Sequence, residues 1–395
     1  MLSGACMLIL DSSSRREVMI RTTLLFALGV CCTLGFSRVN SQEPTARSAA
    51  WDQKAAATYL DDRAIWWKNW SVSDRDHDTS CASCHTTVPY ALARPALRAA
   101  LGETTLTFPE TELQDDVSTR VALWNETNPY YPDQRFGLPK SSESRGTESI
   151  LNALVLSNRD AQEGHLNAET KKAFENLWKL QFTRGDGTGA WAWLYFDLAP
   201  WESEGAAYFG AALAAIAVGI APDQYASSTE IESQLASLRE YLLENYADRS
   251  PFDRVMLLWA SSELSGLLTE EQSRLIADGI LHLQNNDGGW SLTSLGSWDR
   301  EDGYRPAPGS DAYATGLIAF ALQKSGVSPS QKNLGKALDW LVKNQNPTEG
   351  YWPASSLNKE HANVRTRIHV NRRRHCICCS SIDLCRSLHR LSVQP

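Results

Sequence analysis

Two kinds of helical pattern alternate along the chain from residue 146 onward. One kind is mainly apolar and in part rich in Ala and Gly, as in residues 148–156, 204–218 and 311–322, and residues 254–264 occupy the same place without the Gly. The other kind is amphipathic and more polar, as in residues 168–181, 230–246, 270–284 and 331–345. A helix that is apolar all round is buried, whereas an amphipathic helix covers a core with one face. The alternation therefore predicts an all-α fold in which an inner ring of helices lies inside an outer ring.

The chain before these repeats has less regular patterns. Residues 42–75 are rich in aromatic side chains and predict a helical segment, and residues 76–89 form a polar stretch typical of a loop. Residues 90–101 are rich in Ala and Leu and predict a helix. Residues 102–145 are interrupted by prolines, which predicts irregular structure. We therefore expect a Trp-rich, mainly helical region over residues 42–145, followed by the repeats.

A short motif follows three of the amphipathic segments. It is cleanest at Gln284 to Trp290, which reads Gln-Asn-Asn-Asp-Gly-Gly-Trp. Residues 345–352 repeat it with one extra residue, and residues 181–191 repeat it with a longer loop. Such a Gly can end a helix, while the Gln amide can bond to unpaired backbone groups and stack on the Trp.

These motifs resemble the QW repeats of the squalene–hopene cyclase and prenyltransferase superfamily, over roughly residues 146–352. The resemblance implies an α/α toroid of paired helices, here placed at residues 146–361, with an apolar small molecule in its cavity. Other α/α barrels, including helical glycan-processing toroids, are alternatives. The cyclases of this family use an Asp-x-Asp-Asp cluster, and only Asp311 stands in a comparable segment. The Asp, Cys and His zinc ligands of the prenyltransferases lack a counterpart, because residues 146–352 contain no Cys.

The sequence Cys81-Ala82-Ser83-Cys84-His85 is a complete Cys-x-x-Cys-His motif. Two thiols at this spacing can form thioether bonds with the vinyl groups of haem, and the adjoining imidazole can bind the iron. We expect covalently attached haem c on Cys81 and Cys84, with His85 as the proximal ligand. A disulfide, a redox dithiol and half of a zinc site completed by His77 are the alternatives.

The second axial ligand of such an iron is not evident from the sequence. Met256 is the only Met beyond residue 19, and its apolar surroundings favour a packing role. His77, His165 and His282 are the other imidazoles of residues 51–352, the part of the chain that contains all the Trp. A five-coordinate iron that binds a small ligand is a further possibility.

Acidic and aromatic residues in the repeats offer other candidates. Glu148, Glu204 and Asp311 recur at the expected starts of inner helices, where they can stabilise the helix dipole or form a carboxylate ring around a pocket. Asp311 is the best candidate for a catalytic acid. A cluster of aromatic residues can line an apolar cavity or form core: Trp191, Trp193, Tyr195 and Trp201.

The formal net charge of −8, without a basic stripe in the Trp-bearing region, argues against nucleic acid as a partner. Arg21 precedes an apolar run and small residues, so residues 1–41 are expected to be a signal peptide, with residues 1–18 as an over-long start. An uncleaved anchor is the alternative. We therefore expect a periplasmic or otherwise extracytoplasmic protein without a transmembrane segment in the mature chain.

The segment 362–395 differs in composition from the rest of the chain. It holds seven Arg, one Asp and four of the nine Cys, and it has no Trp. It can be a metal-binding or nucleic-acid-binding tail, but a segment translated out of frame explains the change better. Three functions follow for the whole chain: haem-based electron transfer with a redox partner protein, terpenoid cyclisation using Asp311, or non-catalytic binding of a lipid or glycan.

Overall fold

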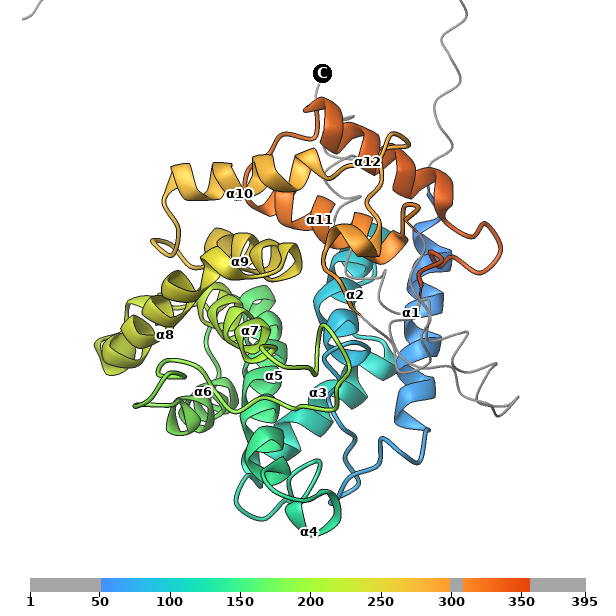
Figure 1. The fold of residues 1–395 in the computed structure, drawn as a ribbon. Coiled ribbons are helices and arrows are strands. Elements are labelled where there is room, and N and C mark those ends of the chain that lie inside the picture. The colour runs from blue at the N-terminus through green and yellow to red at the C-terminus, as the bar shows by residue number, and fades with distance from the viewer. Residues whose placement is uncertain (1–50, 299–307, 356–395) are drawn as a thin grey trace, which may run out of the picture. The chain divides into compact units, whose positions relative to one another are not determined.

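The computed structural model of the protein describes residues 51–298 and 308–355, which belong to one compact unit, Arg47–Pro395 (Figure 1). The predictions for residues 1–41 and 362–395 lie outside the described residues. The helices are α1 (Gln53–Lys68), α2 (Thr87–Leu101), α3 (Phe108–Ala122), α4 (Asp133–Phe136), α5 (Lys140–Glu163), α6 (Ala168–Leu180), α7 (Ala207–Ile220), α8 (Glu232–Asn245), α9 (Pro251–Glu263), α10 (Glu270–His282), α11 (Ala312–Lys324) and α12 (Lys332–Asn344). Within these residues β-pairing is limited to two isolated bridges, so the predicted all-α class is confirmed.

The helices form the predicted inner and outer layers. The inner helices pack on one another in chain order, α5 on α7, α7 on α9 and α9 on α11. Each also packs against the outer helix that follows it, which is α6, α8, α10 or α12. Burial agrees with this arrangement, because α7 and α11 are buried along almost their whole length. Among the described residues, no helix is long and apolar enough to cross a lipid bilayer.

The first three helices belong to the same ring. Helix α2 packs on α5, α1 packs on α2, and α3 packs on both α5 and α6. The boundary expected between residues 145 and 146 therefore lies inside α5. The prolines of residues 102–145 do not prevent a long helix, because Pro109 occupies the first turn of α3, where its missing N–H is harmless. The Glu110 carboxylate accepts a hydrogen bond from the Thr107 N–H at 2.9 Å and caps this helix.

Each QW-type motif makes the same joint between one outer helix and the next. The Gln amide donates to the carbonyl of the motif's Gly and to a carbonyl at the start of the following outer helix. These bonds are Gln181 to Gly189 and Gln234, Gln284 to Gly288 and Asn333, and Gln345 to Gly350 and Asp52. The Trp indole N–H of each motif donates to a carbonyl near the end of its own outer helix, from Trp191 to Leu177, from Trp290 to Ile280 and from Trp352 to Leu341. The Gln therefore joins two helices rather than only ending one.

The third joint closes the outer ring. It links α12 to the N-terminal helix α1, in the way that the other two joints link α6 to α8 and α10 to α12. Gly350 has φ +75° and lies so close to α1 that a Cβ there would be 2.3 Å from the carbonyl carbon of Ala55. Trp51 and Trp352 pack beside it, with ring centroids 5.6 Å apart. Helix α1 therefore occupies the outer place after α12, and the described unit is an α/α toroid.

Replacement of Gln345 by Ala tests this closure. The substitution removes the bonds to Asp52 O and Gly350 O, and also the bond that Asp52 N–H donates to Gln345 Oε1 at 2.7 Å. We expect the free energy of unfolding to fall by about 1–3 kcal/mol, measured by urea denaturation. The control is Asn344→Ala, whose side chain bonds only within α12, to Trp340 O, and whose expected loss is below about 0.5 kcal/mol. Equal losses in the two variants would contradict the closure.

Candidate metal centre at the mouth of the toroid

The N-terminal ends of four inner helices meet at one end of the ring, which we call the mouth. Aromatic contacts show this proximity. His85, just before α2, lies 6.1 Å from Trp201, which precedes α7, and Trp201 lies 5.6 Å from Tyr313 at the start of α11. Phe209 of α7 and Phe252 of α9 are 5.5 Å apart. The Cys-x-x-Cys-His segment therefore lies at the mouth of the toroid, rather than in a separate domain.

Three side chains at the mouth form a group with the geometry of a metal site. One potential ligand atom from each of Cys84, His85 and Glu202 lies within 4.8 Å of the other two. Cys84 Sγ is 3.9 Å from Glu202 Oε1. Cys84 is buried, while His85 and Glu202 are half-buried. In the part of the chain that the structure describes, no other trio of His, Cys, Asp or Glu meets the same distance limit.

The cysteine loop is held from several sides. The Cys81 N–H donates to Ser73 O at 2.9 Å, and the Trp67 indole N–H donates to Cys81 O at 2.8 Å. The Ala82 N–H donates to the Tyr130 hydroxyl at 3.2 Å. These bonds leave the loop backbone well satisfied, so the positions of the thiols are defined before any ligand binds.

Glu202 is placed by a tight chain reversal before α7. Its N–H donates to Leu198 O at 2.9 Å, and its carbonyl accepts from the N–H groups of Phe196 and Leu198. His85 is oriented by its neighbours, since Nδ1 lies 3.2 Å from Thr86 Oγ1 and the ring makes an edge contact with Trp67 at 6.2 Å. The three side chains thus come from two segments whose backbones are each fixed independently.

Burial dominates the electrostatics of this group. It raises the pKa of Glu202 to about 7, although Lys140 favours the charged carboxylate. Burial and the nearby Glu202 also raise the pKa of the Cys84 thiol, and burial raises that of Cys81 to about 12. Without a cation, thiols in this environment are neutral. A bound cation would favour the thiolate and carboxylate forms, because its charge compensates for the lost hydration.

The sequence-predicted residues are only partly brought together. Cys84 and His85 belong to the group, whereas Cys81 does not. Residues 146–352 contain no Cys, so the counterpart of the prenyltransferase Cys ligand was not expected in the toroid. The structure places Cys84 at the mouth nevertheless, because it immediately precedes the inner helix α2. Glu202 was not predicted from the sequence, since it is an isolated acid in a loop, whereas Glu204, two positions further on, was predicted as a candidate.

Asp311, the candidate catalytic acid, is the N-cap of α11. Its Oδ1 accepts bonds from the Tyr313 and Ala314 N–H groups, and its Oδ2 accepts one from the Ser355 N–H at 2.7 Å. It is 7% exposed, and burial raises its pKa. With both oxygens bonded to backbone groups, Asp311 has the surroundings of a structural cap.

The other candidates have separate places. Glu148 is fully buried in α5 and paired with Arg120, while Glu204 is exposed, so these acids do not form a carboxylate ring with Asp311. Of the suggested iron ligands, Met256 is buried in α9, and the three histidines are exposed: His77, His165 and His282. Trp191, Trp193 and Trp201 are buried in the core, whereas Tyr195 is exposed.

Haem matches the donor types of this segment, but its attachment would require the packing around them to rearrange. Cys81 and Cys84 are free thiols, as thioether formation requires. However, they are only 6% and 8% exposed, and Cys84 faces Glu202. The ring of His85 contacts Trp67 and Trp201. A porphyrin on His85 would displace these side chains, whereas a single ion between the three ligands would not.

Comparisons with known proteins assign no family to the chain. No family model matches the chain, and no curated protein matches it. Two solved structures of glycosidase variants each align with a TM-score of 0.47 and 11% identity, covering 85% of this chain and 98% of theirs. A polysaccharide lyase aligns with a TM-score of 0.33 and 11% identity, covering 88% of this chain and 93% of its own. A function for this toroid therefore has to be argued from the residues at its mouth.

Proposed function

We propose that the protein is a metalloprotein whose ion is bound by Cys84, His85 and Glu202. The observation that carries this proposal is the approach of the three ligand atoms to within 4.8 Å of one another. Thiolate, imidazole and carboxylate are all ligands of Zn²⁺, which makes zinc the best match to this mixed set. Three protein ligands leave a fourth position for water or substrate, as in catalytic zinc sites.

The sulfur–oxygen distance requires little adjustment. In a tetrahedral zinc site, Zn–S of about 2.3 Å and Zn–O of about 2.0 Å place sulfur and oxygen about 3.5 Å apart. Cys84 Sγ and Glu202 Oε1 are 3.9 Å apart. A shift of a few tenths of an ångström in the position of either side chain would close this difference. The resulting ion would carry two anionic ligands, so the buried site would be close to electroneutral.

The reaction class that suits this site is metal-assisted hydrolysis or another Lewis-acid reaction. The ion would activate a water molecule or polarise a carbonyl at its open position. Trp67 and Trp201 border His85 and shield that side of the site from bulk water. The Trp201 indole N–H donates to the Tyr313 hydroxyl at 3.2 Å, which fixes this aromatic wall.

The metal content of matched variants tests the proposal. Purified protein is reconstituted with Zn²⁺, passed through a desalting column and analysed by inductively coupled plasma mass spectrometry. We expect about one equivalent in the wild type and in Cys81→Ser, and much less in Glu202→Gln, because Cys81 lies outside the group. Retention of zinc by Glu202→Gln, or its loss only in Cys81→Ser, would contradict the three-residue site.

A second candidate is covalent haem c, with electron transfer to a redox partner protein. It is favoured by two free thiols at the Cys-x-x-Cys-His spacing. Cys81 and Cys84 would hold the porphyrin and His85 the iron, after rearrangement of the aromatic wall. This candidate also includes export through the signal peptide expected at residues 1–41, which lie outside the described residues.

The variants Cys81→Ser and Glu202→Gln separate the two functions, because haem attachment needs Cys81 and does not need Glu202. A pyridine haemochrome spectrum after expression with a c-type maturation system would reveal covalently attached haem.

A further inference from the structure

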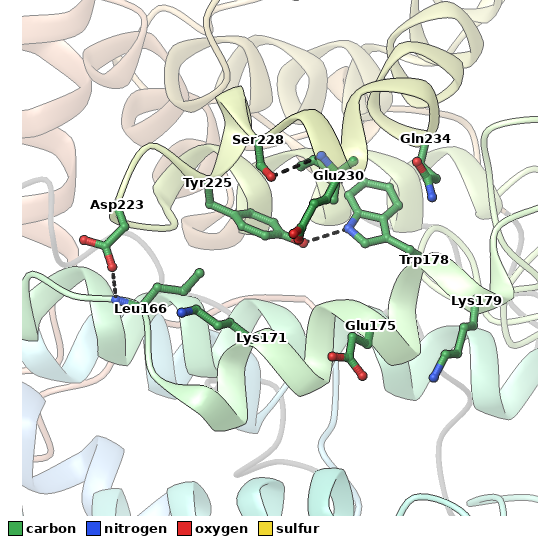
Figure 2. A pocket seen from close by; sticks show the side chains of 11 residues that line it. Leu166, Lys171, Glu175, Trp178, Lys179, Asp223, Tyr225, Ser228, Glu230 and Gln234 are labelled. Atoms are coloured by element: carbon green, nitrogen blue, oxygen red, sulfur yellow. Dashed lines mark hydrogen bonds between the residues drawn. The ribbon is translucent and has the colours of Figure 1, made fainter.

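A separate cavity opens in the outer layer, between α6 and the segment that joins α7 to α8 (Figure 2). Its volume is about 560 Å³, which lies in the range of small-molecule sites. It shares no residue with the metal group at the mouth. Helix α6 and the turn before it form one wall, and residues 223–234 form the other. The residues that line the cavity include Lys171, Glu175, Trp178, Lys179, Asp223, Tyr225, Glu230 and Gln234.

Two aromatic rings form a fixed apolar surface in this cavity. The Trp178 indole N–H donates to the Tyr225 hydroxyl at 2.9 Å, which joins the two walls. Phe174 stacks on Tyr225, with ring centroids 4.2 Å apart and an interplanar angle of 24°. Tyr225 is half-buried and lines the cavity, so part of its ring is available to a ligand. The ring is rigid before binding, which reduces the entropy lost on binding.

The backbone of the opposite wall is also constrained. Asp223 and Gln224 are consecutive non-glycine residues in the left-handed region, with φ of 58° and 55°. The Leu166 N–H donates to Asp223 Oδ2 at 2.8 Å and ties this turn to the start of α6 (Figure 2). The Asp223–Leu166 bond therefore holds this wall in one position relative to α6.

The polar groups around these rings include both donors and acceptors. Lys171 and Lys179 supply ammonium groups, Glu175 and Glu230 supply carboxylates, and Gln234 supplies both functions of an amide. Within the described residues, Lys171, Lys179 and Glu230 make no ion pair, whereas Glu175 pairs with Lys172 at 3.0 Å. With Asp223 the lining carries two positive and three negative charges, so neither sign dominates.

We infer that this cavity binds a neutral saccharide. A sugar presents hydroxyls that both donate and accept, together with an apolar face formed by its C–H groups. The mixed donors and acceptors match the hydroxyls, and the ring of Tyr225 matches the apolar face. A strongly anionic ligand would meet three carboxylates, and a lipid tail would meet charged groups on both walls. The site is independent of the metal centre.

A glycan array carrying neutral and acidic glycans is the first test, followed by calorimetric titration of the best neutral oligosaccharide. We expect binding to neutral glycans, weakened about tenfold in Glu230→Gln and in Lys171→Ala, since each removes one hydrogen bond to a charged group. Lys343→Ala is the control, because Lys343 is an exposed residue of another outer helix, α12, and does not line the cavity. It should bind as the wild type does.

Three results would overturn the inference: no binding to any glycan on the array, binding to acidic glycans alone, or equal affinities in the wild type and both cavity variants. Binding of a free amino acid such as glutamate, competing with no glycan, would also overturn it and indicate a site for a zwitterion. Zinc content, measured on the same Glu230→Gln protein, should equal that of the wild type. Failure of the saccharide site is thereby distinguished from failure of the metal centre.

Discussion

Replacing Arg120 by Met is expected to lower the free energy of unfolding by about 3–5 kcal/mol. Arg120 and Glu148 are both fully buried, and Arg120 Nε lies 2.5 Å from Glu148 Oε1. The other guanidinium nitrogens bond to Asp76 and to Asn128 O. Met would fill much of the volume of the Arg120 side chain. The Glu148 carboxylate would then keep Arg145 as its remaining cation, with a guanidinium nitrogen 3.2 Å from Glu148 Oε2. Urea denaturation followed by circular dichroism measures the loss.

The loss should grow with pH. Burial already raises the pKa of Glu148 against the effect of Arg120, and removal of the guanidinium raises it further. A folded-state carboxyl pKa above the unfolded value stabilises the protein at low pH, and this contribution disappears as the pH rises through the folded value. Arg120→Met should therefore lose more of the free energy of unfolding at pH 8 than at pH 5. The double variant Arg120→Met/Glu148→Gln should lose less than Arg120→Met alone.

The control is Arg274→Met, which breaks an exposed ion pair with Asp278 and should lower the free energy of unfolding by less than about 0.5 kcal/mol. A loss for Arg120→Met as small as this would contradict the account.

Zinc should stabilise the folded protein, and replacement of His85 by Ala should abolish this effect. At a free zinc concentration about 100 times the dissociation constant of the wild type, the stabilisation should be about 2.7 kcal/mol. His85→Ala removes one of three protein ligands, so we expect the affinity to fall by at least about 100-fold and the stabilisation at that concentration to nearly vanish. Thermal unfolding with and without a chelator measures both.

His165→Ala is the control for nonspecific zinc binding, because His165 is exposed and lies outside the group. Its response to zinc should equal that of the wild type. A zinc response that survives in His85→Ala, or that disappears in His165→Ala, would place the ion elsewhere on the protein.

The layered helical fold could be predicted because its signal is local. The apolar segment 311–322 became α11 and the amphipathic segment 270–284 became α10, in both cases within two residues of the predicted limits. Burial on all sides leaves a continuous apolar run, and burial of one face leaves a periodic pattern, so each helix can be recognised within its own segment. Helix α3 is not predicted by its sequence, because Pro109 is typical of a break in regular structure, although a proline is compatible with the first turn of a helix.

The site could be predicted only where its residues are adjacent in the chain. Cys84 and His85 form part of a recognisable motif, whereas Glu202 is 117 positions beyond His85 and reaches it only through the closure of the ring. The role of Gln345 was equally hidden, because its partner Asp52 lies at the other end of the described chain. Such contacts depend on the packing of the whole toroid, which local periodicity does not specify.

X-ray absorption spectroscopy at the zinc edge of the reconstituted protein tests the metal site most directly. We expect one sulfur at about 2.3 Å, from Cys84, and nitrogen or oxygen ligands at about 2.0–2.2 Å, from His85, Glu202 and a solvent molecule. A first shell with no sulfur, or with two sulfurs from Cys81 and Cys84 together, would contradict it.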